Sequence, residues 1–517
     1  MIVEARDLPS IELCRLISNT PVLSLKGDPN FLVENLVVDS RIIGVGDSGV
    51  AFLALKGANN DGHSYIPRLL EMGVKAFIVS DDVDVPDDVT LVKVEDTRKA
   101  LSDIAAVFYN NPSEKMKVVG VTGTKGKTTI TNLITEILER TGNPTGLIGT
   151  ISYKLPDKII TSKNTTPESI DLQSLLYQME SGGQKHVVME VSSHAIALGR
   201  IANVDFDVAV LTNLTRDHLD FHKTFENYVQ TKAKLFEMLG SYGEHEGKIW
   251  PKVAVVNVDD EHSDTILKAA ERSGSLIYTY SCREDKGADF TATDIHIDKL
   301  GIKYTLNTSM GKGPFHVESC LVGKFNVYNT LAALIAVFAL KVDFEDSITA
   351  LKLFNGVPGR FQSVDAGQPF RVIVDYAHSP DSLENVLRTV KELVGEGRII
   401  TVFGCGGDRD RGKRAVMGRI SSEISDYTII TSDNPRTEDP EFITGEIAEG
   451  IDNRAADRYE IVQDRREAIE RAVEMAEDHD IVVIAGKGHE TYQIFRDRTI
   501  HFDDVEEAVN AIKKLVK

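Results

Sequence analysis

The chain has 517 residues, of which 42% are hydrophobic and 26% are charged, and its formal net charge is −21. This length predicts about three domains, and the composition is that of a folded globular protein. A surface this acidic repels phosphate backbones and anionic lipids, which disfavours general binding to nucleic acid or to a membrane surface.

The cysteines are widely scattered and show no metal-ligand spacing, so we expect buried free thiols in a reducing compartment. They are Cys14, Cys282, Cys320 and Cys405. The first residues lack the basic region and apolar run of a signal peptide, and the most apolar helix candidate, residues 330–340, is too short to span a bilayer. We therefore expect a cytoplasmic protein without membrane insertion.

Apolar strands recur along the chain in three blocks. Residues 1–112 hold short strands such as "NLVVDSR" and "KAFIVS", whereas residues 113–345 and 346–517 each repeat an apolar strand, a polar or Gly-rich tip and a helix-like segment. The repeated strands lie at 117–123, 186–193, 207–214, 253–260, 370–380, 399–407, 427–435 and 480–488. Strands that are apolar throughout are typical of sheets buried on both faces, so the pattern predicts an α/β protein with parallel sheets.

The ends of these strands carry residues suited to chemistry. They are Lys127, Thr128, Glu190, Asp217, His218, Asp375, His378, Arg409, Asn434 and Arg436. Ligands of open α/β sheets bind at the carboxyl ends of the strands, so two such edges predict a ligand cleft between two domains.

The stretch "VVGVTGTKGKTTITNLI" from Val118 to Ile134 matches a phosphate loop between a strand and a helix. Its glycines let backbone N–H groups turn towards phosphate oxygens, and the helix that follows points its positive end at them. Lys127 can neutralise the β- and γ-phosphates, and the Thr128 hydroxyl can bind Mg²⁺. The predicted loop residues are Gly123, Thr124, Lys125, Gly126, Lys127, Thr128 and Thr129.

Two further segments offer magnesium ligands. Glu190 ends an apolar strand, where a carboxylate suits Mg²⁺ but is as often structural. Residues 217–222 gather two aspartates and two histidines whose spacing is not that of a zinc site, so we favour a magnesium and phosphate role with His218 as the main candidate. On composition alone, Lys232 and Lys234 of the amphipathic segment 228–239 are expected to be solvated.

The last block supplies groups for a nucleotide and an amino acid. Asp375 can accept the ribose hydroxyls, and the cation-rich stretch 404–414 is either an anion site or a solvated loop. Arg436 can grip a carboxylate through two parallel hydrogen bonds, while Gly486 offers backbone and Glu490 a carboxylate. ATP, magnesium and a substrate with an amine and carboxylates fit a ligase that activates a carboxylate as an acyl phosphate, which an amine then attacks.

These motifs resemble those of the Mur ligases, the ATP-dependent ligases that build the cell-wall peptide. The resemblance rests on their order along nearly the whole chain: "VVDSR", "GANNDGHSYI", "GTKGKTT", "NTTPES", "MEVSSH", "TNLTRDHLDFH", "YVQTKAKLF", "GKFNVYN", "GVPGRFQ", "DYAHSPDSL", "FGCGGDRDRGKR", "DNPRTEDP" and "GKGHE". It implies a UDP-substrate-binding domain over 1–112, a central P-loop ATP-binding domain over 113–345 and a C-terminal Rossmann-like domain for the amino acid over 346–517.

The resemblance also implies roles for single residues. ATP is then held by the phosphate loop with Asn329, Arg360, Asp375 and His378. Two Mg²⁺ ions are held by Thr128, Glu190, His218 and Lys232, the last as a carbamate formed with CO₂. The UDP-linked peptide contacts Ser40, the stretch 58–60, Asn164, Thr165, Thr166, Ser192 and Arg200. The incoming amino acid contacts Arg409, Asp433, Asn434, Pro435, Arg436, Gly486 and Glu490.

The closest motifs are those of family members that add the third residue of the peptide. Arg436 in its rigid Asn-Pro turn favours a planar carboxylate, which meso-diaminopimelate carries at its distal carbon and lysine lacks. We therefore predict a monomeric enzyme that adds meso-diaminopimelate to a UDP-linked muramoyl peptide.

Several alternatives stay open. Within the family these are an L-lysine-adding enzyme and an archaeal pseudomurein peptide ligase. A folylpolyglutamate or cyanophycin synthetase shares the core but not the "DNPR" motif. A P-loop switch that ligates nothing would not need Arg409, Arg436 and Glu490 at strand ends.

Overall fold

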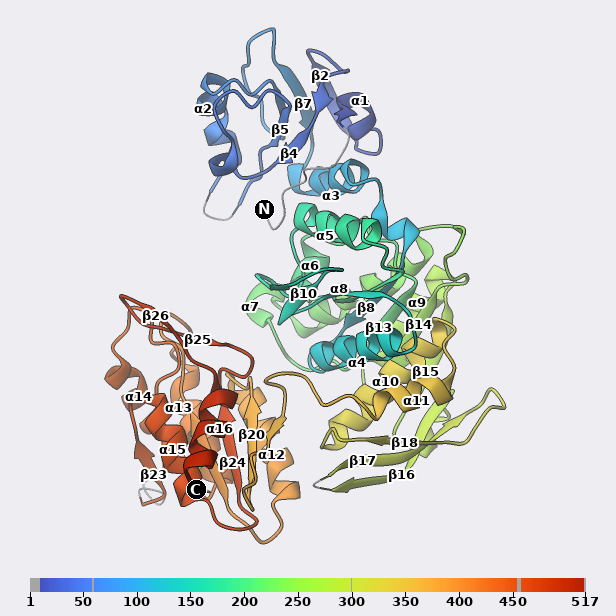
Figure 1. Cartoon of the computed structure of the whole chain (residues 1–517). Helices are drawn as coiled ribbons and strands as arrows, with labels where there is room; N and C mark the ends of the chain where they lie inside the picture. Colours follow the sequence, from blue (N-terminus) through green and yellow to red (C-terminus); the bar gives the residue numbers. More distant parts are fainter. Residues whose placement is uncertain (1–9, 58–59, 299, 453–456, 516–517) are drawn as a thin grey trace. The chain divides into compact units, whose positions relative to one another are not determined.

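The computed structural model of the chain describes residues 10–57, 60–298, 300–452 and 457–515, and it shows an α/β protein built on three large sheets (Figure 1). The chain divides into two compact units. The first runs to Ile295 and includes Lys303–Glu318 and Val327–Leu353; the second holds His296–Ile302, Ser319–Asn326 and the chain from Phe354 onward. The predicted fold class is confirmed, while the three domain boundaries stay predictions.

The N-terminal part of the first unit contains a five-stranded sheet in the order β2-β7-β6-β5-β4. Its strands are β2 Val22–Lys26, β4 Asn35–Val37, β5 Val50–Leu53, β6 Ala76–Val79 and β7 Thr90–Val94; a small pair, β1 Ile11–Glu12 and β3 Leu32–Val33, stands apart. Its helices are α1 Leu13–Leu16, α2 Ile66–Glu71 and α3 Thr97–Phe108. The strands β4 to β7 are parallel, and β2 pairs antiparallel with β7.

The central sheet follows the order β11-β10-β9-β12-β8-β13-β14-β15-β16-β17-β18. Its strands are β8 Lys117–Thr122, β9 Thr145–Ile148, β10 Ser152–Lys154, β11 Ile159–Thr161, β12 His186–Glu190, β13 Val208–Leu211, β14 Val253–Asn257, β15 Leu276–Ser281, β16 Phe290–Asp298, β17 Gly301–Thr308 and β18 Phe315–Ser319. Its helices are α4 Lys127–Arg140, α5 Ser169–Ser181, α6 Ser193–Ala197, α7 Leu219–His222, α8 Phe225–Glu237, α9 Ser263–Ser273, α10 Lys324–Ala339 and α11 Phe344–Leu351. The strand that precedes the phosphate loop, β8, lies between the parallel strands β12 and β13, which places three strand ends side by side.

Four charged side chains are buried at the amino ends of these strands, the edge opposite the phosphate loop. Lys252 donates hydrogen bonds to Asp205 and Asp207, and Lys248 forms ion pairs with the same two carboxylates. Asp207 also accepts the backbone N–H of Val118 in β8 at 2.7 Å. Because the two pairs neutralise each other, this network ties β8, β13 and β14 together without leaving a net buried charge.

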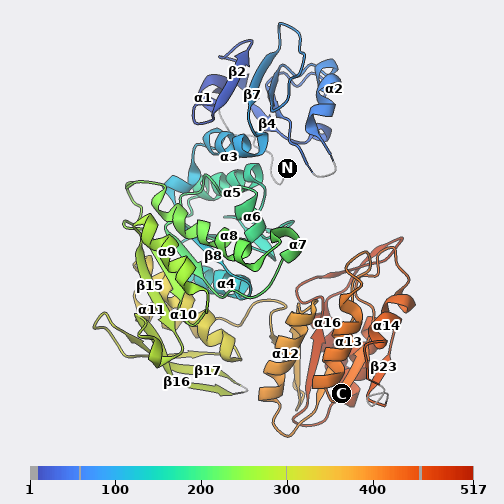
Figure 2. The same cartoon turned by 180° about the vertical axis from the view of Figure 1, so that it is seen from behind.

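The second unit contains a six-stranded sheet in the order β19-β20-β24-β21-β22-β23, parallel except for β19. Its elements are β19 Gln362–Val364, β20 Arg371–Asp375, α12 Pro380–Leu393, β21 Ile399–Phe403, α13 Lys413–Ile424, β22 Tyr427–Ile430, α14 Pro440–Ala448, β23 Tyr459–Ile461, α15 Arg465–Met475, β24 Ile481–Ala485 and α16 Asp504–Leu515, with a hairpin of β25 Tyr492–Ile494 and β26 Thr499–His501. Helices α15 and α16 cover one face (Figure 1) and α12 and α13 the other (Figure 2). Helices on both faces explain why the strands are apolar throughout.

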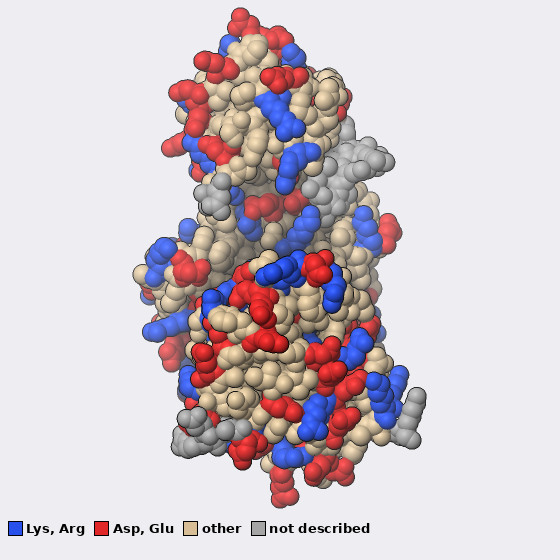
Figure 3. Space-filling model, turned by 90° about the vertical axis from the view of Figure 1, so that its left-hand side faces the viewer, with Lys and Arg blue, Asp and Glu red and all other residues tan. Residues whose placement is uncertain are grey.

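The cysteine prediction is only partly right. Cys405 is buried, Cys14 and Cys282 are partly exposed, and Cys320 is exposed, and all four are free thiols. Among the described residues, no helix combines the length and apolar character needed to cross a bilayer. Acidic and basic side chains are interspersed over the face drawn in Figure 3, so a local cluster of cations, rather than the overall charge, must attract an anionic ligand.

Candidate active site

The phosphate loop lies between β8 and α4, as predicted. Gly123 has φ +143°, and a Cβ atom on it would lie 1.8 Å from Thr212 Oγ1, so only glycine fits there. The Thr212 hydroxyl in turn donates to the carbonyl oxygen of Lys125 at 2.6 Å. The Lys127 side chain folds back onto the loop, and its ammonium donates to the carbonyl oxygens of Gly123 and Thr124, both at 2.9 Å. The cation is therefore held at the loop and the helix N-terminus, where an anion is favoured.

Glu190 ends β12, next to the loop, and lies in a shell of oxygen and N–H groups. Its Oε2 accepts from the Thr128 hydroxyl at 3.1 Å and from the Thr150 hydroxyl at 3.0 Å, while Oε1 accepts from the Thr150 N–H at 2.7 Å. The Glu190 side chain is buried. The structure thus brings the predicted ligands Thr128 and Glu190 together, and their hydroxyl and carboxylate oxygens suit a hard cation such as Mg²⁺.

The segment after β13 supplies the other side of the loop. The Thr124 N–H donates to the Asn213 carbonyl at 2.8 Å, which anchors this segment to the phosphate loop. His218 has φ +53° and is half exposed, with Nε2 3.5 Å from an oxygen of Asp217. His222, by contrast, is buried and bonded to the Ser193 hydroxyl at 3.0 Å, which is a structural role. Of the two histidines in this segment, His218 is therefore the one available to a ligand.

Lys232 is buried, which contradicts its interpretation as a solvated lysine from composition. Its Nζ donates to the Gly123 carbonyl at 2.9 Å and to the Thr122 hydroxyl at 3.3 Å. Burial lowers the pKa of the Lys232 ammonium well below its usual range, and the Lys127 cation lowers it further. Lys234 is exposed, as expected.

Helix periodicity contains the signal that separates the two lysines. The apolar Tyr228, Val229, Leu235 and Phe236 lie three or four positions from Lys232 and are all buried, so Lys232 shares their face. Composition alone does not carry this information.

Most residues predicted for the UDP-linked peptide gather around the end of β12. The Thr166 hydroxyl donates to the Glu190 carbonyl at 2.8 Å and accepts the Ser192 N–H at 3.1 Å. Arg200 donates to the Thr166 carbonyl at 3.1 Å and pairs with Glu168 at 2.6 Å. Thr165 and Asn164 precede Thr166 on the same segment: the Thr165 hydroxyl lies 3.1 Å from that of Thr150, and the Asn164 carbonyl accepts from Tyr153.

Two of the predicted contacts are not in this group. Ser40 begins a 3₁₀ turn, Ser40–Ile42, beside the five-stranded sheet. In the stretch 58–60, residues 58 and 59 lie outside the described residues.

The residues predicted to face ATP fall into two groups. Asn329 on α10 belongs to the first unit, and its Oδ1 would lie 2.7 Å from a Cβ on Gly126, so it packs against the phosphate loop. Arg360, Asp375 and His378 belong to the second unit and gather around Tyr376: the Arg360 guanidinium lies 4.9 Å from the ring centre and the His378 ring 4.5 Å.

Asp375 is more constrained than expected for a ribose ligand. Its two carboxylate oxygens accept the backbone N–H groups of Phe361 at 2.6 Å and Ala377 at 2.8 Å. Burial raises the pKa of the Asp375 carboxyl, and the Arg360 cation opposes this. Asp375 thus organises the two backbone segments beside it, and its contact with ribose stays a prediction.

The loop after β21 and the turn after β22 are locked together. The Gly407 N–H donates to the Asn434 carbonyl at 2.9 Å. In the other direction, the Arg436 guanidinium donates to the Gly407 carbonyl at 2.8 Å. Arg436 has φ +54°, a left-handed conformation that costs a non-glycine residue about 1 kcal/mol or more. Arg409 follows Gly407 on the same loop and is exposed, whereas Arg414 is buried in ion pairs with Glu438 and Glu446. The cation-rich stretch therefore combines a structural arginine with accessible ones.

A carboxylate and an amide face each other next to these arginines. The Asn434 side chain, after Asp433 and before Pro435, donates from Nδ2 to Glu490 Oε2 at 2.9 Å. Gly486 directly follows β24 and has φ +119°, and a Cβ on it would lie 2.8 Å from Asp433 Oδ2. The ends of β21, β22 and β24 are neighbours in the sheet, so the residues predicted for the amino acid do come together.

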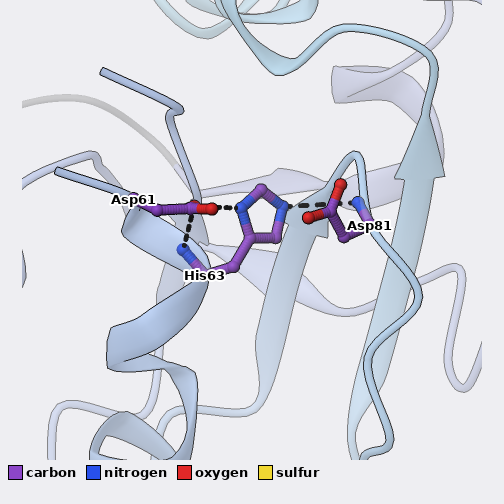
Figure 4. A group of neighbouring side chains, drawn as sticks. All are labelled: Asp61, His63 and Asp81. Carbon is purple, nitrogen blue, oxygen red and sulfur yellow. Dashed lines mark hydrogen bonds and ion pairs between the residues drawn. The ribbon is translucent and has the colours of Figure 1, made fainter. Parts of the chain in front are cut away.

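A second group with metal-binding side chains lies in the N-terminal part and has another explanation. Figure 4 shows His63 between Asp61 and the backbone of Asp81. Its Nε2 accepts the Ser80 N–H at 3.0 Å, which leaves Nδ1 to donate to Asp61 at 2.6 Å. Both ring nitrogens of His63 therefore form hydrogen bonds within the protein, and the group links two loops rather than offering a metal site.

Three stretches of the chain match known domain families: residues 33–109 the Mur ligase family catalytic domain, residues 121–337 the Mur ligase middle domain and residues 359–488 the Mur ligase glutamate ligase domain. A UDP-N-acetylmuramoyl-L-alanyl-D-glutamate–2,6-diaminopimelate ligase from Clostridioides difficile is 44% identical over 98% of this chain and 100% of its own length. One of the same name from Syntrophomonas wolfei is 41% identical over 98% and 100%. The chain belongs to the Mur ligase family.

The solved structures agree. A diaminopimelate ligase of the same name has a TM-score of 0.71 at 33% identity and covers 98% of this chain and 100% of its own. A pseudomurein peptide ligase from Methanothermus fervidus (18% identity, TM-score 0.52) and a folylpolyglutamate synthase from Thermotoga maritima (17%, 0.58) share the fold alone. The predicted enzyme class, an ATP-dependent ligase, is thereby confirmed, and Mur ligases use ATP and Mg²⁺.

Several polar residues of this Mur ligase site were not singled out from the sequence. Thr150 and Glu168 bind Glu190 and Arg200, respectively, and Lys487 and His489 stand inside the "GKGHE" motif. The His489 ring lies 4.8 Å from that of Tyr376, and burial lowers its pKa to about 4, so the imidazole is neutral. The motifs that contain Glu168, Lys487 and His489 were recognised, whereas Thr150 lies outside every recognised motif; only packing shows which of these residues are buried and which partners they have.

Proposed function

We propose that this Mur ligase joins meso-diaminopimelate to UDP-N-acetylmuramoyl-L-alanyl-D-glutamate through an acyl phosphate. The names of relatives 41–44% identical over nearly the whole chain support the two substrates. The observation that carries the proposal is the two-sided amino-acid site. Arg436 and Arg409 offer guanidinium groups for a carboxylate, and Glu490 beside Asn434 offers a carboxylate for an ammonium.

The first chemical step would take place at the phosphate loop. An oxygen of the acceptor's carboxylate attacks the γ-phosphorus of ATP, and ADP leaves with the electrons of the broken P–O bond. Lys127 and the N–H groups at the start of α4 stabilise the charge on the transferring group. Bound Mg²⁺, for which Thr128, Glu190 and His218 are the candidate ligands, would supply further positive charge at the phosphate oxygens.

Lys232 would enter this step as a carbamate. A lowered pKa favours the neutral amine, whose nitrogen can attack CO₂; an N–C bond forms and a proton is released. The product is a carbamate, whose anionic oxygens could bind a second Mg²⁺. The Lys232 nitrogen lies beside the Thr122 hydroxyl, although the two residues are 110 positions apart in sequence. The neighbouring Lys127 cation favours such an anion electrostatically.

In the second step the amine of diaminopimelate attacks the acyl carbon, and inorganic phosphate leaves. The distal end of the amino acid, with one carboxylate and one ammonium, matches Arg436 on one side and Glu490 on the other. Lysine lacks the distal carboxylate, so it would bring only a cation towards Arg436. Arg436 is partly buried, and lysine would leave its guanidinium without a carboxylate partner. A site built to bind a polar group rejects an analogue that lacks it, which predicts a preference of about 10²–10³-fold for diaminopimelate.

A competition assay tests the proposal. Purified protein receives ATP, Mg²⁺, the UDP-linked dipeptide and equal amounts of meso-diaminopimelate and lysine, and the products are separated by mass. Wild type is expected to form the diaminopimelate product, and Arg436→Ala and Arg436→Lys are expected to lose the preference. A wild type that prefers lysine, or variants that keep the preference, would overturn the selectivity argument.

We also propose that the enzyme works in the cytoplasm, where ATP is available, and as a monomer. Size-exclusion chromatography with light scattering tests the oligomeric state.

A further inference from the structure

Lys487 is a fully buried cation in the amino-acid site. It follows Gly486 at the end of β24, and its side chain has no exposed surface. Its Nζ lies 3.1 Å from Asn434 Oδ1, 3.4 Å from Glu490 Oε2 and 3.7 Å from Asp433 Oδ1. One ammonium group thus faces two carboxylates and one amide oxygen.

This contact determines how the Asn434 amide is oriented. Asn434 Oδ1 also accepts the backbone N–H of Ile494 at 3.0 Å, so two donors converge on the oxygen side of the amide. The NH₂ side must then point the other way, where it donates to Glu490 Oε2. Without the Lys487 ammonium, the amide would keep one donor on its oxygen, and its orientation towards Glu490 would be less strongly determined.

The ammonium also balances charge. Asp433 and Glu490 together carry two negative charges, and Lys487 reduces the total to one. Two carboxylates in a buried site favour the protonated form of one of them unless a cation lies between them. Burial raises the pKa of the Glu490 carboxyl and Asp433 raises it further, whereas Lys487 and the Asn434 amide lower it.

The groups around Glu490 come from the segments after β20, β22 and β24, from β25 and from α15. Titratable and charged groups that face it are Asp433, Lys487, Tyr376, Tyr492 and Arg465. Arg465 is already paired with Asp504 at 2.8 Å, and the tyrosines are neutral. Lys487 is therefore the cation in this group that pairs directly with Glu490.

We propose that Lys487 is a positioning residue of the amino-acid site, which keeps Glu490 ionised and aims it at the distal ammonium of the incoming amino acid. This inference rests on the proposed function, because it takes Glu490 to be the partner of that ammonium. Lys487 itself has no free surface and acts through Glu490 and Asn434.

The test is the pH dependence of kcat/KM for meso-diaminopimelate in Lys487→Met, with ATP and the UDP-linked dipeptide saturating. Loss of the ammonium raises the pKa of Glu490, so the acidic limb of the profile moves to higher pH. We expect kcat/KM on the acidic limb, below the pKa of Glu490, to be lower by about tenfold for each unit by which that pKa rises, and to approach the wild-type value at higher pH, where Glu490 is ionised in both proteins. The KM for ATP stays unchanged. Lys391→Met, which removes an exposed lysine from α12, is the matched control and should behave as wild type.

A second variant separates positioning from a general loss of packing. If Lys487 acts through Glu490, then Lys487→Met combined with Glu490→Gln should lose no more activity than Glu490→Gln alone. The double variant leaves fewer unpaired buried charges than Lys487→Met alone. It can therefore be measured even if Lys487→Met does not fold. An unshifted profile in Lys487→Met, or losses that multiply in the double variant, would overturn the inference. A wild type that does not ligate diaminopimelate would instead refute the proposed function.

Discussion

Replacing Gly486 by alanine perturbs the amino-acid side of the site without removing any hydrogen-bonding group. The backbone φ of +119° is a region that side chains rarely adopt, which costs about 1–3 kcal/mol. The new Cβ would lie 2.8 Å from Asp433 Oδ2 and must displace it. We expect a total loss of about 2–4 kcal/mol in the free energy of unfolding, and a higher KM for the amino acid because Asp433 adjoins Asn434.

The measurements are urea unfolding and steady-state kinetics with each substrate varied in turn. Gly445→Ala in α14 is the matched control, because its Cβ would meet nothing within 4 Å and the helix would gain up to about 1 kcal/mol. The KM values for ATP and for the UDP-linked dipeptide should stay near wild type in both variants. Equal stability of Gly486→Ala and Gly445→Ala, with an unchanged KM for the amino acid, would refute this argument.

Three further predictions concern the central sheet. Lys127→Ala should lower kcat by about 10³-fold or more, because the charge on the transferring phosphoryl group loses its cation; near-normal ADP release would contradict the P-loop assignment. Lys232→Ala should be nearly inactive and partly rescued by acetate, which supplies an anionic oxygen; a structure with ATP and Mg²⁺ bound that shows a bare ammonium at position 232 would speak against the carbamate. Lys252→Met should cost about 3–5 kcal/mol of stability by leaving Asp205 and Asp207 with Lys248 alone, while every KM stays unchanged; a loss below about 1 kcal/mol in urea unfolding would show that the network is not essential.

The sequence by itself determined the α/β class and the positions of the strands. Each predicted strand from 117–123 to 480–488 is present, because a parallel strand covered by helices on both faces must be apolar at every position. The phosphate loop could also be predicted from the sequence. Backbone geometry requires glycine at position 123, and phosphate binding requires the lysine and threonine at the start of α4. Both requirements concern residues that are adjacent in sequence, so they can be recognised without the tertiary structure.

The order of the strands and the burial of single charges were decided only by the tertiary structure. Lys232 and Lys234 are alike in composition, yet only Lys232 packs beneath the phosphate loop. Lys487 and Asn434 are 53 positions apart in sequence and meet because β22 and β24 both lie beside β21. Whether a charge is buried, and which groups surround it, depends on neighbours that come from distant strands. The pKa of Glu490 and the orientation of Asn434 therefore could not be predicted from the two motifs that contain these residues.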